Sequence, residues 1–225
     1  MNRRDFIAGA GAGIATILVS GCSLKPENKV QQEIPRMVVA SNDGGDNKMK
    51  IVVITGSPHE RGTSALLADK FIEGAQKRGH DVFRFNAAFE EIHPCLGCDR
   101  CGMDGPCVQR DDIEKKLMPE ILKADLVALV TPLYYYGMSA QIKIAIDRFY
   151  ARNSKLHGRK KAVLMATAYN SSDWTFNALA EHYKTLARYM EWENVGTVLA
   201  LGCGGRSDIE RSEFPNQAYQ LGMSV

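Results

Sequence analysis

Four cysteines lie close together in the middle of the chain, and thiols at this spacing can bind metal or react with one another. They are Cys95, Cys98, Cys101 and Cys107. An iron-sulfur cluster needs four thiolates around a small cube, and glycines among these cysteines give the backbone freedom to wrap around one. The spacing therefore makes a [4Fe-4S] cluster one candidate for this loop.

Two other kinds of site use the same thiols. A zinc ion accepts four thiolates in a tetrahedron, although its ligands usually come as paired knuckles. Disulfides also form among closely spaced cysteines when a protein works in an oxidising compartment. The residues alone leave the cluster, the zinc site and the disulfides open.

A second candidate site is the polar loop between residues 56 and 64, Gly-Ser-Pro-His-Glu-Arg-Gly-Thr-Ser. It follows a β-branched run and precedes an expected helix, so it combines hydroxyl groups and a cation with the free N–H groups of a helix N-terminus. Such a loop suits a phosphate monoester. It matches neither the P-loop nor the dinucleotide-binding glycine pattern, and this argues against a nucleoside triphosphatase.

A third candidate site holds three consecutive aromatic residues, Tyr134, Tyr135 and Tyr136, in the loop from Thr131 to Ser139. Exposed aromatic surface is costly unless something covers it. A planar ring system would use these side chains well, and the alternative is packing against a neighbouring loop or subunit.

Five apolar runs and four amphipathic segments must position these loops. Strands are predicted at 50–55, 81–85, 126–130, 162–166 and 195–201, with the second at a sheet edge and the third at the centre. Helices are predicted after residue 63 and over 111–121, 140–150 and 173–190. This alternation predicts a doubly wound α/β fold, a five-stranded parallel sheet with helices on both faces and ligands at the carboxyl ends of its strands.

For other residues that could do chemistry we predict structural roles. We expect Asp147 and Arg148 to form an ion pair or a helix cap, and Cys203 to be a small buried apolar residue. Trp174 and Trp192 are expected to pack the last predicted helix.

The N-terminal segment has the order of an export signal. Arg3 and Arg4 precede an apolar stretch of about 14 residues, which is shorter than the roughly 20 that a membrane-spanning helix needs. The stretch ends at Val-Ser-Gly-Cys22, which resembles the bacterial lipobox. We expect residues 1–21 to be a twin-arginine lipoprotein signal, Cys22 the lipidated residue, and 22–48 a flexible tether. The folded domain is then 49–225, anchored at the outer face of a membrane; alternatives are an unstructured N-terminus and an edge strand at 37–40.

The phosphate and tyrosine loops together carry a family resemblance. The first resembles the phosphate loop of the NADPH-dependent FMN reductase family, and the stretch from Pro132 through Arg148 resembles the same family's isoalloxazine loop and helix. The resemblance covers about 50–205 and implies a flavodoxin-like fold that binds FMN. It places the FMN phosphate at Ser57, His59, Arg61, Thr63 and Ser64. It places the ring along Pro132, Leu133, Tyr134, Tyr135, Tyr136 and Gly137, with Ala168 and Tyr169 on the other side. His59 and Thr63 stand where the family has Arg and Asn, so Arg61 is expected to carry the phosphate charge.

The cysteine spacing is similar to the compact motif of the iron-sulfur flavoproteins, a branch of the same family with a [4Fe-4S] cluster near FMN. Other relatives carry similar cysteines without a cluster, so free thiols join the open alternatives.

Composition limits the partners. With 28 basic and 26 acidic residues the formal charge is +2, too little for binding a nucleic-acid backbone by electrostatics. The resemblance implies an FMN-dependent NAD(P)H oxidoreductase and a homo-oligomer, in which the flavin performs the chemistry and no catalytic triad is needed. The alternatives are an exported electron carrier without substrate turnover and a structural domain that has lost the flavin. The sequence does not name the electron donor or acceptor.

Overall fold

A five-stranded parallel sheet forms the centre of the protein in a computed structural model, which describes residues 48–225. Its order is β2-β1-β3-β4-β5, so the direction of winding reverses between β1 and β3. The fold is flavodoxin-like, and the doubly wound prediction is confirmed. The expected signal and lipidated Cys22, with nearly all of the tether, lie outside the described residues. The strands are β1 (Lys50–Thr55), β2 (Asp81–Asn86), β3 (Leu126–Pro132), β4 (Lys161–Thr167) and β5 (Glu193–Ala200).

The position of each strand follows from its residues. β1, β3 and β4 are nearly continuous apolar runs and are buried almost throughout, as strands covered on both faces must be. β2 alternates polar and apolar residues and lies at one edge, as predicted. All the strands point the same way, so the loops after them gather at one edge of the sheet.

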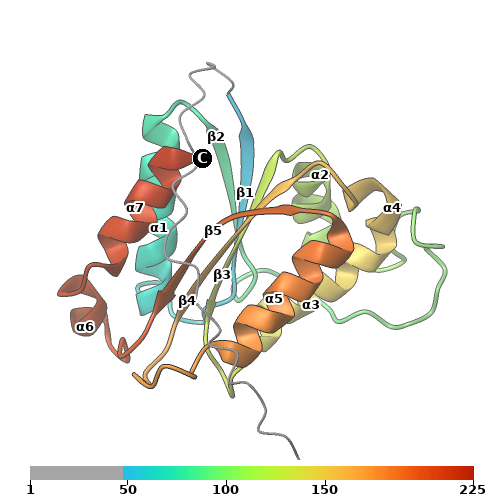
Figure 1. Ribbon diagram of the computed structural model, residues 1–225. Coiled ribbons are helices and arrows are strands. Elements are labelled where there is room, and N and C mark those ends of the chain that lie inside the picture. The colour runs from blue at the N-terminus through green and yellow to red at the C-terminus, as the bar shows by residue number, and fades with distance from the viewer. Residues whose placement is uncertain (1–47) are drawn as a thin grey trace, which may run out of the picture. The chain divides into compact units, whose positions relative to one another are not determined.

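Helices cover both faces of the sheet (Figure 1). One face carries α1 (Thr63–Lys77), α6 (Arg206–Glu210) and α7 (Phe214–Ser224), and the other carries α2 (Met118–Ile121), α3 (Ala140–Asp147), α4 (Asn153–Leu156) and α5 (Asn177–Met190). Among residues 48–225, no helix has the length and apolar character needed to cross a bilayer.

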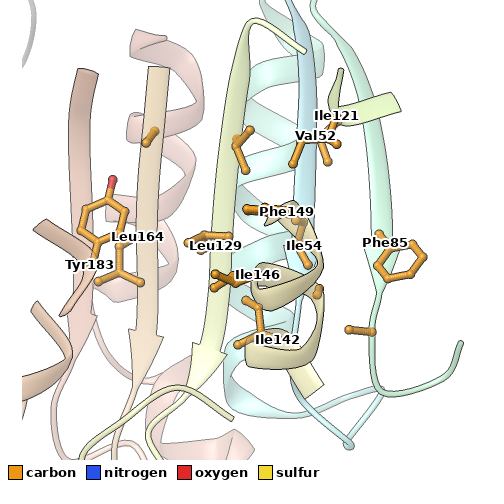
Figure 2. Packing of buried hydrophobic residues seen from close by; sticks show 14 of the residues in the cluster. Val52, Ile54, Phe85, Ile121, Leu129, Ile142, Ile146, Phe149, Leu164 and Tyr183 are labelled. Atoms are coloured by element: carbon orange, nitrogen blue, oxygen red, sulfur yellow. The ribbon is translucent and has the colours of Figure 1, made fainter. Parts of the chain in front are cut away.

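Two apolar clusters, one on each face, hold the helices to the sheet. On the α1 face, Leu67, Phe71 and Ala75 repeat every four residues and are fully buried against the strands. The opposite cluster is larger, and Figure 2 shows it from close by. Its labelled members are Val52, Ile54, Phe85, Ile121, Leu129, Ile142, Ile146, Phe149, Leu164 and Tyr183.

The C-terminal helices were not predicted, and they matter for α1. Gly74 of α1 lies against the backbone of α7 at Tyr219, and Gly222 of α7 lies against the backbone of α1 at Phe71. A Cβ atom at either glycine would collide with main-chain atoms, so the two helices pack as closely as their backbones allow. α7 therefore fixes the helix whose N-terminus follows the polar loop.

Three predicted helices differ in detail from those observed. The segment after Asp112 begins as a π-helix, η1 (Ile113–Leu117), before α2, and Pro119 sits in the first turn of α2. The predicted helix 140–150 ends at Asp147 and continues as a 3-10 turn, η2 (Arg148–Arg152). α5 begins at Asn177, four residues later than the predicted start at 173, because residues 173–176 form a turn before it.

Candidate functional site

The loop after β1 leaves hydrogen-bonding groups unused at the head of α1. Ser64 is 2% exposed and its hydroxyl has no hydrogen-bond partner in the structure. Gly62 caps the helix and has no side chain to accept from its first N–H groups. Buried polar groups are almost always satisfied, so an orphan hydroxyl beside free N–H groups is the geometry of an anion site.

The remaining members of this loop are placed differently from one another. Ser57 is buried and its hydroxyl accepts from the His59 N–H at 3.1 Å. The Thr63 hydroxyl lies 2.9 Å from the Thr167 hydroxyl, which ties the head of α1 to the end of β4. The side chains of His59 and Arg61 are exposed, so both can reach a bound anion only from the solvent side.

Sequence reasoning missed Arg206, a second cation at this loop. Its guanidinium donates to the carbonyls of Arg61 and Gly62 at 3.3 and 3.4 Å and is held by Glu210 at 2.7 Å. It comes from α6, 145 residues after Arg61 in the sequence, so no local motif could have revealed it. Arg206 places positive charge beside the polar loop 56–64, which we call the anion loop from here on. It also restrains the backbone of that loop.

The three tyrosines form a strained turn. Tyr134 and Gly137 exchange two backbone hydrogen bonds, of 3.1 and 3.0 Å, around Tyr135 and Tyr136. Both central residues have positive φ, +47° and +62°, which is the type I′ geometry that normally calls for Asn and Gly. Holding two tyrosines there costs of order 1–3 kcal/mol each. Tyr135 is fully exposed, so the turn displays aromatic surface rather than burying it.

Buried hydrogen bonds connect the tyrosine turn to the anion loop. Ser139, at the end of the turn, donates from its hydroxyl to the Gly56 carbonyl at 2.7 Å. Its backbone N–H donates to the Thr131 hydroxyl at 3.0 Å, and the Leu133 N–H donates to the Thr167 carbonyl at 2.8 Å. The loops after β1, β3 and β4 therefore form one connected site at the switch point.

The loop after β4 adds aromatic surface to this site. Ala168 is buried under the sheet edge, whereas Tyr169 is largely exposed and lies against Gly204 of the next loop. The prediction for Trp174 was wrong. It is 51% exposed, and its ring stacks on Tyr136 with centroids 5.1 Å apart rather than packing α5. Trp192 does pack the core, where its indole N–H donates to the Leu156 carbonyl.

The four cysteines of the loop line one pocket. All four are free thiols in the structure, so the disulfide alternative has no counterpart among the described residues. Within residues 48–225, no three His, Cys, Asp or Glu side chains are gathered closely enough to hold a metal ion. The donor set itself is the one that an iron-sulfur cluster requires. Gly97 and Gly102 have positive φ and open space around them, as a loop that must close further would need.

A buried ion pair anchors this loop, and it corrects the prediction for Asp147 and Arg148. Arg148 pairs with Asp111 at 2.6 Å, with each side chain only 1% exposed. Asp147 instead bonds Lys143 on the surface at 2.5 Å. Asp111 also accepts from the Glu114 N–H at 3.3 Å, at the start of the helical segment that follows.

One further polar group borders the cysteine pocket. The Tyr150 hydroxyl donates to Asp99 at 2.7 Å, and this hydrogen bond, more than its other surroundings, raises the pKa of the phenol. Cys203, by contrast, is buried beyond β5 as expected, and burial raises the pKa of its thiol.

Residues 49–204 match the NADPH-dependent FMN reductase family, which is more than half of the chain. The chain belongs to this family. Membership confirms the resemblance carried by the two loops, and the matched residues contain the anion loop, the tyrosine turn and the cysteine loop.

Several curated relatives of this chain are named iron-sulfur flavoproteins. One from Methanocaldococcus jannaschii is 33% identical over 100 residues, which are 44% of this chain and 51% of the relative. Another, from Archaeoglobus fulgidus, is 36% identical over 115 residues, 49% of this chain and 51% of the relative. The chain spans about half the length of these relatives. One from Methanosarcina thermophila is 27% identical over 154 residues, 68% of this chain and 78% of the relative.

Solved structures support the fold of this family member. The Trp repressor binding protein of Bacillus subtilis superposes with a TM-score of 0.58 at 24% identity, over 76% of this chain and 99% of the other. An azoreductase from Bacillus anthracis gives 0.62 at 16% identity, over 79% and 100%. At such identities the likeness concerns the fold alone.

Proposed function

We propose that this protein is an FMN-dependent NAD(P)H oxidoreductase. The proposal rests on two features that lie in one connected site. The first is the buried Ser64 hydroxyl without a partner at the head of α1, and the second is the strained, exposed tyrosine turn, which Ser139 links to the same loop. A phosphate monoester satisfies the first and a planar ring covers the second. FMN contains both groups, and it is the cofactor after which the family is named.

The residues of the anion loop would hold the phosphate. Ser64 and the first N–H groups of α1 supply donors from the buried side. Ser57, Thr63 and His59 line the same loop, and Arg61 with Arg206 supplies the positive charge. Arg206 would share with Arg61 the role that we expected from the sequence for Arg61 alone.

The tyrosine turn would orient the flavin ring. Pro132, Leu133 and the backbone of Tyr134 to Gly137 run along the edge where the ring is expected, and Ala168 with Tyr169 borders the opposite side. When bound, FMN accepts a hydride from a reduced nicotinamide and releases electrons singly or in pairs. The chain's part is to orient the ring and limit its access to water, which explains why no paired-carboxylate or triad arrangement is required.

The cysteine loop would hold a [4Fe-4S] cluster that transfers single electrons. Four cysteines around one pocket support this, as do relatives named iron-sulfur flavoproteins. Iron and sulfide analysis of anaerobically purified protein tests it, with Cys98→Ala expected to remove the iron and spare FMN. Zero iron, or one zinc per chain, would reject the cluster and leave the flavin proposal standing.

Export and anchoring complete the proposal. Arg3, Arg4 and Cys22 support delivery by the twin-arginine route to a membrane surface, where the domain would act as a lipid-anchored homo-oligomer. Mass spectrometry of the membrane fraction should find a mature chain that begins at lipidated Cys22. Unchanged export of an Arg3→Lys, Arg4→Lys variant, or retention of Met1, would contradict this part alone.

Turnover decides between an enzyme and a carrier. The purified protein should oxidise NADH or NADPH in the presence of an added acceptor. Stoichiometric FMN with no oxidation of either nucleotide would favour the alternative, an exported electron carrier, which the scarcity of NAD(P)H outside the cytoplasm also favours. Titration with FMN and riboflavin tests the site itself: riboflavin bound as tightly as FMN would refute the assignment of residues 57–64.

A further inference from the structure

The ion pair between Arg148 and Asp111 holds together the two ends of the cysteine loop. We call these ends, residues 93–94 and 109, the neck of the loop. Arg148 Nη1 donates to the His93 carbonyl at 3.0 Å, and its Nη2 donates to the Gln109 carbonyl at 3.5 Å. These carbonyls lie two residues before the first cysteine of the loop and two residues after the last. One guanidinium therefore bridges both ends of the loop.

Two further bonds reinforce the neck. Asp111 accepts from the His93 N–H at 2.9 Å with the same oxygen that binds Arg148. The Gln109 side chain donates to the Pro94 carbonyl at 2.7 Å, which ties one strand of the neck directly to the other. These bonds thus hold both ends of the loop between Cys95 and Cys107 in fixed positions.

Arg148 also borders the pocket that the cysteines line. Its Nε atom is buried and has no hydrogen-bond partner in the structure. Burying a charged group costs desolvation free energy even when the group is paired, and an unsatisfied buried N–H adds to that cost. Thiolate sulfur is an acceptor, and an acceptor in this pocket would satisfy that donor.

We propose that Arg148 is a positioning residue of the four-cysteine site. Its fork holds the two ends of the loop so that four thiolates can close on one metal centre, and its free Nε–H donates to one of their sulfurs. Asp111 fixes the orientation of the guanidinium. This inference rests on the proposed metal-thiolate site, but it assigns a role to residues outside the cysteine motif.

The test uses Co²⁺ as the probe, because its thiolate complexes absorb in the visible and need no cluster assembly. The full chain, reduced and freed of metal, is titrated with Co²⁺ as wild type and as Arg148→Lys. The lysine keeps the charge but loses the fork and the Nε–H. Loss of a residue that orients metal ligands costs about 10–100-fold in metal affinity, so we expect a loss in this range.

Arg152→Lys is the matched control. Arg152 comes from the same 3-10 turn and forms a well-buried pair with Glu114 at 2.6 Å, but it makes no bond to His93 or Gln109. Its Co²⁺ affinity should stay within about threefold of wild type, well below the loss expected for a positioning residue. Equal affinities for wild type, Arg148→Lys and Arg152→Lys would overturn the role of Arg148 while leaving the metal site intact.

A second variant covers the case in which Arg148→Lys does not fold. Arg148→Gln combined with Asp111→Asn removes both buried charges at once and so leaves no unpaired ion. We expect it to fold and to bind Co²⁺ as weakly as Arg148→Lys, and wild-type affinity in this variant would refute the proposal. A wild-type chain that binds neither Co²⁺ nor iron would refute the proposed thiolate site itself, and the inference with it.

The reduction potential of the iron-loaded protein gives a readout that a purely structural role would not move. Hydrogen bonds to cluster sulfurs stabilise the reduced state. Arg148→Lys should therefore shift the midpoint to a more negative potential, while Arg152→Lys leaves it in place. An unchanged midpoint in both variants would refute the Nε–H donor.

Discussion

The Ser139 hydroxyl donates to the Gly56 carbonyl at 2.7 Å across 83 residues of sequence. The same oxygen accepts from the Ile142 N–H at 3.5 Å, so one buried side chain caps α3 and holds the start of the anion loop. A Cβ atom at Gly56 would collide with Ser139, which shows how closely the two loops approach.

Replacing Ser139 by alanine should damage both stability and binding. Loss of a cap and of a buried hydrogen bond should lower the free energy of unfolding by about 1–3 kcal/mol. FMN affinity should fall as well, because the anion loop loses its support. Denaturant unfolding of the apo-protein measures the first effect and fluorescence titration the second. Wild-type stability in Ser139→Ala would contradict the structural role given to this hydroxyl.

Ser64→Ala should behave in the opposite way. Its hydroxyl is buried without a partner, so removing it should leave the apo-protein as stable as wild type or slightly more stable. A lost hydrogen bond to a charged group corresponds to about 10–100-fold weaker FMN binding. Riboflavin has no phosphate, and its affinity should be unchanged. A parallel loss of riboflavin binding would show that Ser64 does not face the phosphate.

The two tyrosines with positive φ should lower the stability of the apo-protein and strengthen flavin binding. Tyr135→Asn with Tyr136→Gly supplies the residues that a type I′ turn prefers, and should raise the free energy of unfolding by about 1–2 kcal/mol. Because the ring loses its aromatic edge, FMN and riboflavin should both bind more weakly. Thermal melting of the apo-protein and paired titrations test this, and a variant less stable than wild type would contradict the strain.

Trp174 offers an optical probe of the flavin site. The exposed Trp174 ring stacks on the Tyr136 ring. FMN bound beside Tyr136 should therefore quench the fluorescence of Trp174 more strongly than that of the core residue Trp192. In Trp192→Phe most of the quenching should therefore remain, and in Trp174→Phe most should disappear. The reverse pattern would place the flavin away from the tyrosine turn.

The thiols should differ sharply in reactivity. Cys203 is buried with a raised pKa, so little of it is the reactive thiolate at pH 8. Cys95 and Cys98 are exposed. Iodoacetamide should modify these two at least about tenfold faster than Cys203. Peptide mapping gives the rates, and iron loading should protect the loop cysteines while leaving Cys203 unchanged.

The sequence predicted the sheet well because its strands are defined by short-range patterns. Continuous apolar runs identified β1 and β3, and the alternation in β2 identified an edge strand. The polar loop at 56–64 and the tyrosine loop were likewise predicted from residue types between a strand and a helix. Each of these signals lies within about ten residues, where local physical preferences dominate.

What the sequence did not reveal depends on contacts between distant residues. Arg148 was read with its neighbour Asp147, but its partner Asp111 lies 37 residues away. Trp174 was assigned to α5 by proximity, although it stacks on Tyr136 from another loop. Arg206 reaches the anion loop only because α6 and α7 fold back beside α1. Tertiary packing, not local pattern, selected these partners.

The close packing of Gly74 and Gly222 has a consequence for the order of folding. α1 is made early during synthesis, yet the helix that locks it against the sheet is encoded by residues 214–224. The position of α1 therefore depends on a segment that is synthesised much later, and a chain cut before Phe214 should lack the contact that holds α1. If export is reserved for folded protein, such a truncated chain would also remain on the side of the membrane where it was made.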